Sequence, residues 1–198
     1  MREVPKGVSR GKKLTLVPTD LLERLMRISN REGKTLYSFV SEIFEQALRV
    51  YESKHTLEEV VDFFELMETQ KASGAVITPV DVLTYLIGEI YPSGKDVLCE
   101  RWYESGRWYG KYLVDRFHNQ DQVDALGKLL AVTRWDLKEV LVKEENGVVK
   151  VRCVSPLLPL ENTELLVRFV EGVMDSLGYK VRKEDFMRGI VLLEFEKG

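Results

Sequence analysis

The chain is poor in cysteine and histidine, the usual ligands of structural zinc. Its 198 residues include two cysteines and two histidines. Cys99 and Cys153 lie far apart in the sequence, and His55 and His118 each stand alone, whereas structural zinc sites draw on clustered ligands. We therefore expect no metal and no cofactor. We expect both cysteines to be free, buried side chains that behave as small apolar residues.

Long apolar runs are also missing. No segment approaches the roughly 20 apolar residues of a membrane helix, and no apolar core of a secretory signal follows the basic N-terminal residues. The sequence shows neither a nucleophile paired with a base nor a phosphate-binding loop. We expect a cytoplasmic protein with reduced thiols that is not an enzyme and has no membrane partner.

Charge is unevenly distributed along the chain. The net charge is −3, but residues 1–54 carry +4 and the remaining residues carry −7. Salt screens electrostatic attraction over about 10 Å, so a basic segment can bind phosphates although the whole chain is acidic. The pattern favours an anionic partner for the N-terminal segment.

The first 54 residues predict a short strand followed by two helices. Residues 1–11 form a basic arm, and the β-forming segment 12–17 (KKLTLV) predicts the strand. Apolar residues at a 3.6-residue period then predict a helix that ends at Gly33 and a second helix capped by Thr35.

These elements are too small to bury a core of their own. The second helix carries apolar residues on a face that is too wide for one partner helix. Both observations predict an obligate homodimer, or a higher even oligomer, in which the helices of two copies interdigitate and the two strands pair. The alternative is that both helices pack on the remainder of the chain.

The segment KKLTLVPTDLLERLMRISNREGKTLYSFVSEIFEQAL resembles the ribbon-helix-helix superfamily of the CopG, Arc and MetJ type. The resemblance implies a transcriptional regulator in which a two-stranded ribbon, one strand from each copy, enters the major groove of double-stranded DNA. It also implies that the N-terminus of the second helix binds a phosphate. The residues expected to contact phosphates or bases on this basis are Arg10, Lys12, Lys13, Lys34, Thr35 and Leu36.

Two registers are open for the strand. Counting back from Val17, the usual pattern of the superfamily turns Leu14 and Leu16 towards the DNA. Hydrophobicity favours the opposite register, because burying a leucine is worth about 1.5–3 kcal/mol, and it leaves Lys13 and Thr15 to face the bases. We choose this second register, with an irregularity that brings Val17 to the DNA side. The alternative is that the strand serves dimerisation alone.

A helical linker is expected at 55–75, with a capping box between Thr56 and Glu59, and an α+β domain at 76–198. The turn Asn146-Gly147 predicts a hairpin, Asn162 or Thr163 is expected to cap the last helix, and Gly178 is expected to end it. We expect helices near 79–91, 95–117, 121–131 and 164–177, and a four-stranded antiparallel sheet from strands near 136–144, 148–154, 179–183 and 189–196.

The long helix of this domain interleaves aromatic and basic residues. Gly106 and Gly110 predict a close approach by a ligand, a strand or a partner, because each glycine destabilises a helix by about 1 kcal/mol relative to alanine. Ordinary core packing is the alternative interpretation of the aromatic residues. The candidate ligand-binding residues are Trp102, Arg107, Trp108, Tyr109 and Tyr112.

From residue 79 onward the chain resembles ligand-binding domains related to 4-vinyl reductase and to the TRAPP transport subunits, through ESGRWYGKYLVDRF, NTELLVRFVEGVMDSLGYKV and GIVLLEFE. This resemblance implies either a small apolar effector or a dimer surface. Together the two resemblances describe a DNA-binding regulator whose second domain senses an effector or mediates oligomerisation. The alternative is an antitoxin-like interaction module, which is less favoured because such chains usually end in a disordered tail rather than in strands.

Overall fold

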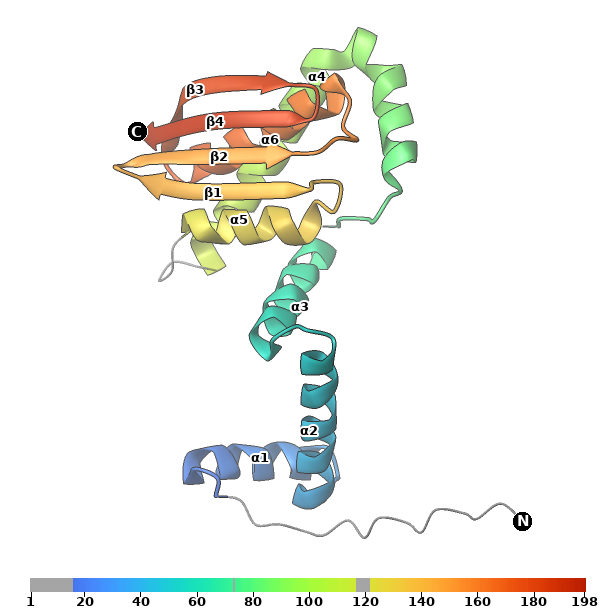
Figure 1. Ribbon diagram of the computed structural model, residues 1–198, viewed down its shortest axis with the longest axis vertical. Coiled ribbons are helices and arrows are strands. Elements are labelled where there is room, and N and C mark those ends of the chain that lie inside the picture. The colour runs from blue at the N-terminus through green and yellow to red at the C-terminus, as the bar shows by residue number, and fades with distance from the viewer. Residues whose placement is uncertain (1–15, 73, 117–121) are drawn as a thin grey trace, which may run out of the picture. The chain divides into compact units, whose positions relative to one another are not determined.

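The computed structural model describes residues 16–72, 74–116 and 122–198. The chain divides into two compact units, Met1–Asp62 and Phe63–Gly198 (Figure 1). The division falls within helix α3 (Leu57–Ala72), which therefore contributes to both units.

The first unit contains the two predicted helices, α1 (Thr19–Arg31) and α2 (Leu36–Glu52). Gly33 turns the chain between them with a positive φ of 66°. The Thr35 hydroxyl oxygen accepts the backbone N–H of Ser38 at 3.2 Å, which confirms the predicted N-cap.

The predicted capping box opens α3. The Glu59 carboxylate accepts the Thr56 N–H at 2.8 Å, and the Thr56 hydroxyl oxygen accepts the Glu59 N–H at 3.1 Å. The reciprocal bonds satisfy two N–H groups that a helix start leaves without partners.

The predicted N-terminal strand falls mostly outside the described residues. Of its positions, Leu16 and Val17 are described; they have no regular secondary structure, and Leu16 is fully exposed. A β-ladder requires a second strand, and the strand was expected to pair with that of another copy.

The second unit is an α+β fold, as predicted. Its four antiparallel strands run in the order β1-β2-β4-β3, and α6 packs on the sheet while α5 lies along β1 (Figure 1). Its remaining elements are α4 (Val80–Arg116), α5 (Gln122–Thr133), β1 (Glu139–Glu145), β2 (Val148–Val154), α6 (Leu160–Ser176), β3 (Tyr179–Met187) and β4 (Ile190–Lys197).

The hairpin prediction is confirmed. Asn146 and Gly147 both have positive φ, 54° and 78°, as a two-residue turn between β1 and β2 requires. Alternate residues of the central strands are buried and form much of the core: Val149, Val151 and Cys153 on β2, and Val191, Leu193 and Phe195 on β4.

Helices α4 and α6 approach each other closely through glycines. A Cβ on Gly106 would overlap the backbone carbonyl of Phe169, and a Cβ on Gly172 would overlap the backbone carbonyl of Tyr103. A Cβ on Gly110 would lie 2.6 Å from the carbonyl oxygen of Val173. The close approach predicted for Gly106 and Gly110 is therefore made by a helix of the same unit.

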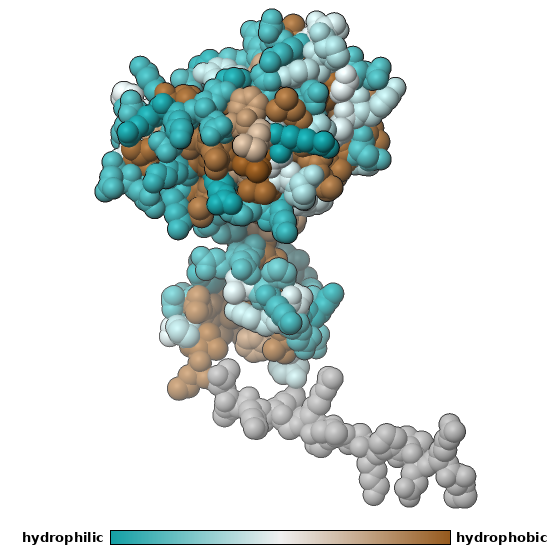
Figure 2. Space-filling view, turned by 45° about the horizontal axis from the view of Figure 1, so that its top comes forward, coloured by the Kyte–Doolittle hydropathy of each residue, from teal (hydrophilic) through white to brown (hydrophobic). Residues whose placement is uncertain are grey.

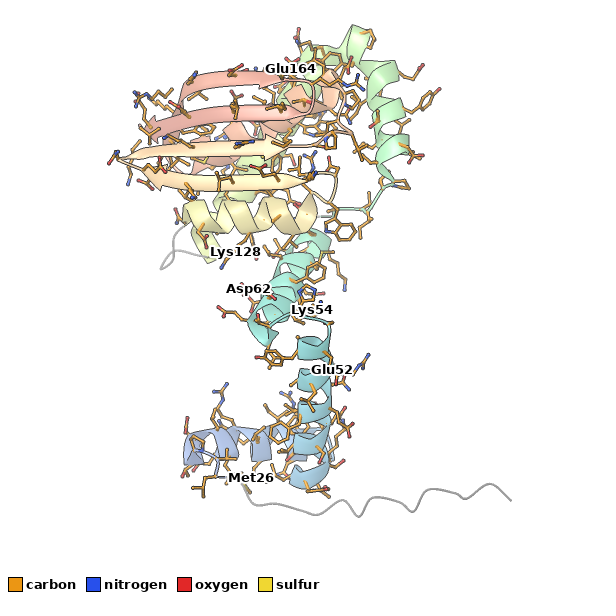
Figure 3. All side chains as sticks on the ribbon, viewed as in Figure 1. Met26, Glu52, Lys54, Asp62, Lys128 and Glu164 are labelled. Atoms are coloured by element: carbon orange, nitrogen blue, oxygen red, sulfur yellow. The ribbon has the colours of Figure 1, made fainter. Side chains whose placement is uncertain are left out.

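Helix α4 breaks where the sequence predicts that one helix ends and the next begins. Gly94 has non-helical angles, φ −125° and ψ 18°, two residues after Pro92. Tyr91 before the break and Lys95 after it both bind the Glu164 carboxylate on α6, the lysine at 2.8 Å. Glu164 is labelled in Figure 3. Although burial alone would raise it, these two partners hold the pKa of Glu164 below its usual value.

The prediction that Asn162 or Thr163 caps α6 is wrong. The helix begins at Leu160 and its N-cap is Pro159, which makes no side-chain cap bond. Thr163 instead accepts the Gly189 N–H at 2.9 Å, and Asn162 donates to the Thr84 hydroxyl at 3.3 Å. Both side chains serve tertiary contacts. The prediction that Gly178 follows the helix end is confirmed by its φ of 82°.

Both cysteines are free, as predicted. Cys153 is buried in the core, and burial raises the pKa of its thiol to about 12; Cys99 is only partly buried. Across residues 16–72, 74–116 and 122–198, no helix combines the length and apolarity needed to cross a membrane.

The glycine contact yields a stability prediction. Gly106→Ala should lower the free energy of unfolding by about 1–3 kcal/mol or more, because the helices must separate to admit the methyl group. Gly88→Ala is the matched control: nothing lies within 4 Å of its Cβ position, so the gain in helix propensity should stabilise by up to about 1 kcal/mol. Urea denaturation followed by tryptophan fluorescence reports on this unit, because all three tryptophans lie in it. Equal effects of the two substitutions would contradict the assignment.

Candidate functional site

Three of the residues predicted to contact phosphates lie at the start of α2. Lys34, Thr35 and Leu36 are consecutive at this end, where backbone N–H groups lack helical partners. The Lys34 ammonium donates to the Glu42 carboxylate at 2.6 Å, which raises the pKa of Lys34. Lys34 therefore has an internal partner that a DNA phosphate would have to replace.

Of the other predicted DNA contacts, Val17 is the one among the described residues. Arg10, Lys12, Lys13 and Thr15 lie outside the described residues, and Val17 is 40% exposed in a segment without regular structure.

The first unit has almost no core of its own. Within residues 16–62, Ser29 is the only buried residue. Phe44 and Leu48 on α2 are 55% and 60% exposed. Met26 on α1, which is labelled in Figure 3, is 47% exposed. Figure 2 shows apolar side chains at the surface of this unit among hydrophilic ones. Within residues 16–62, much of the apolar surface of α1 and α2 is therefore exposed.

The second unit contains a cavity of about 1010 Å³. Its walls come from the end of α3, the segment 75–79, the first part of α4, the end of α5 and the start of α6. Trp102, from the part of α4 that follows the break at Gly94, also lines it. The connection from α5 to β1 contributes Trp135 to the lining. Aliphatic and indole groups such as Met67, Leu83 and Trp102 dominate the lining.

The charged groups of the cavity wall are neutralised locally. The Arg134 guanidinium makes two hydrogen bonds to the Asp136 carboxylate, at 2.9 and 2.7 Å. Although burial alone would raise it, this pairing holds the pKa of Asp136 below its usual value. Lys71 is largely exposed, and its ammonium lies 3.8 Å from the Glu68 carboxylate.

One polar side chain of the cavity has an unused hydrogen-bonding atom. Asn162 is 6% exposed and lines the cavity, and its Oδ1 has no hydrogen-bond partner. Its amide nitrogen donates to the Thr84 hydroxyl at 3.3 Å. A hydroxyl can donate as well as accept, so one amide atom stays unpaired whichever way the amide is turned.

The predicted ligand-binding residues of α4 separate into two groups. Trp102 lines the cavity and also an adjoining hollow of about 460 Å³, which Tyr109 lines too. Arg107, Trp108 and Tyr112 are not among the residues lining either space. Arg107 lies 3.4 Å from the Asp175 carboxylate, and the ring of Trp108 stacks on Tyr112.

The sequence interpretation missed the cavity residues outside α4. Asn162 had been interpreted as a helix cap, and Arg134, Trp135 and Asp136 lie in a turn that delays β1 to Glu139. The pair Arg134 and Asp136, two positions apart around a tryptophan, was the signal available for this turn.

No protein-family model matches the chain, and the search of curated proteins returns no match. In the described parts of the chain, no three His, Cys, Asp or Glu side chains gather in a way that could hold a metal ion.

Proposed function

We propose that this protein is a homodimeric DNA-binding transcriptional regulator of the ribbon-helix-helix kind, whose second unit senses a small effector. The observation that carries the proposal is the helix pair α1 and α2, which exposes its apolar faces and buries no apolar residue within 16–62. A helix pair of this kind needs a partner to exclude water from those faces. A second copy supplies the same apolar surfaces by symmetry.

The basic N-terminal segment supports DNA as the target of the dimer. Residues 1–54 carry a charge of +4, and Lys34, Thr35 and Leu36 stand at a capped helix N-terminus that attracts an anion. In the dimer, two strands formed from 12–17 would pair and enter the major groove, with Lys13 and Thr15 towards the bases.

Helix α3 contains residues of both units, so an effector that contacts it could influence DNA binding. It starts in the first unit, and Met67 and Gln70 on its second half line the cavity. An effector regulates DNA binding only if it has different affinities for the competent and incompetent arrangements.

The dimer yields the first functional prediction. Leu48→Glu places a charge on the exposed apolar face of α2 and should halve the mass of the assembly, because a buried unpaired carboxylate is strongly unfavourable. Gln46→Glu is the control, since it adds the same charge at an exposed position on the opposite side of the helix. Sedimentation velocity at micromolar concentration measures both. A wild-type chain that sediments as a monomer would contradict the proposal.

The Lys34–Glu42 ion pair yields a second functional prediction, which concerns the affinity for DNA. Glu42→Gln should raise the affinity for a DNA duplex, because it frees Lys34 for a phosphate. Lys34→Gln should lower it and reduce the slope of log affinity against log salt by about 0.9 for each phosphate that is no longer neutralised. Glu45→Gln removes the same charge one turn along α2 and controls for net charge. Fluorescence anisotropy at several salt concentrations provides the measurement.

Two results would count against DNA binding through this helix end. One is a wild-type affinity that does not change with salt. The other is an equal gain for Glu42→Gln and Glu45→Gln, which would assign the effect to net charge alone. Footprinting on the protein's own chromosome then tests sequence specificity, since a regulator should occupy sites that share a motif.

A further inference from the structure

We propose that the cavity of the second unit binds an uncharged, largely apolar small molecule that carries one hydrogen-bonding group, which pairs with the side-chain amide of Asn162. The proposal rests on the sensing role of the second unit in the proposed function and names the chemical class of the effector. It does not require DNA binding.

The size and lining of the cavity fit a small organic molecule. Its volume of about 1010 Å³ lies at the upper end of the range of about 300–1,000 Å³ typical of ligand pockets, which are mostly apolar with a few placed polar groups. Leu83, Ile87 and Leu165 contribute aliphatic surface, and Trp102 and Trp135 contribute indole rings. Trp135 is 64% exposed, so part of its surface remains for a ligand to cover.

The electrostatics select against a charged ligand. Arg134 and Asp136 satisfy each other through two hydrogen bonds, and the lysine at the rim is solvated. A charged ligand would lose part of its hydration against the mostly apolar lining without gaining an unpaired opposite charge. An uncharged ligand avoids this loss.

Asn162 supplies a buried polar atom that is available to a ligand. Buried polar atoms in folded proteins nearly always have a hydrogen-bond partner, whereas one amide atom of Asn162 has none although the residue is 6% exposed. A ligand hydroxyl can act as donor or acceptor, so it satisfies this atom in either orientation of the amide. The contact would fix how the ligand is oriented in a mostly apolar space.

Three related probes separate these contributions: 2-naphthol, which is uncharged and has a hydroxyl; naphthalene, which lacks the hydroxyl; and 2-naphthoate, which is charged at neutral pH. Equilibrium dialysis against the full-length protein measures their affinities. We expect 2-naphthol to bind about two- to tenfold more tightly than naphthalene, as one hydrogen bond provides. We expect 2-naphthoate to bind at least about tenfold more weakly than 2-naphthol.

Variants assign the binding to this cavity. Asn162→Leu should remove the preference for 2-naphthol over naphthalene while naphthalene affinity is kept. Leu83→Trp should weaken both uncharged probes by filling the cavity, and it keeps the proposal testable if Asn162→Leu fails to fold. Val97→Trp is the control, because Val97 is exposed on the same helix and does not line the cavity.

Three outcomes would overturn the proposal: no binding of either uncharged probe, tighter binding of 2-naphthoate, or equal weakening by Leu83→Trp and Val97→Trp. If a second copy of the chain occupies the cavity instead, neither uncharged probe will bind, and Leu83→Trp will lower the mass of the assembly. The dialysis experiment involves no DNA, so its outcome does not depend on whether the protein binds DNA. Conversely, absent probe binding would leave the proposed DNA-binding role of the helix pair untouched.

Discussion

The close approach of α4 and α6 governs how the second unit packs. Backbone meets backbone at Gly106 and Gly172, so two helices lie nearer than side chains would allow. The arrangement leaves α6 free to cover the sheet with Val167, Val170 and Met174 while its other side receives α4. Three glycines that weaken the helices individually thus permit layered packing, because the dispersion attraction and excluded water of a close crossing outweigh the reduced helix propensity.

The cavity follows from the way α4 departs from that crossing. At Gly94 the helix turns, and its first part is held back against α6 by Tyr91 and Lys95, which share the Glu164 carboxylate. The space beside this first part is lined by residues of α3, α5 and the turn before β1. Local pairing of Arg134 with Asp136 leaves the wall without an unpaired charge, whereas Asn162 keeps an unpaired atom. This combination of an apolar volume and one polar anchor is what a binding site for an uncharged molecule requires.

The first unit, in contrast to the second, has almost no apolar core within its described residues. Helix α2 is capped by Thr35 and a glycine turn separates it from α1, yet no apolar side chain is buried within 16–62. Local interactions therefore determine its secondary structure but leave its apolar faces in water, which is unfavourable for a stable domain. In the proposed dimer, a symmetric partner would cover these faces and would also supply the second strand of a DNA-reading ribbon. Dimerisation and recognition would then have one physical origin.

Features that depend on a few neighbouring residues could be predicted from the sequence alone. These include the Thr35 cap, the Thr56–Glu59 capping box, the Asn146-Gly147 turn, the break near Gly94 and the α+β order, because each follows from backbone conformation or local hydrogen bonding. Long-range contacts, in contrast, set where α6 begins and what its first polar residues do. Asn162 and Thr163 have good capping chemistry, but Thr84 and Gly189, distant in sequence, bind them instead. The cavity was likewise beyond sequence reasoning, since its walls join segments that are distant in the sequence and its key atom is defined by lacking a partner.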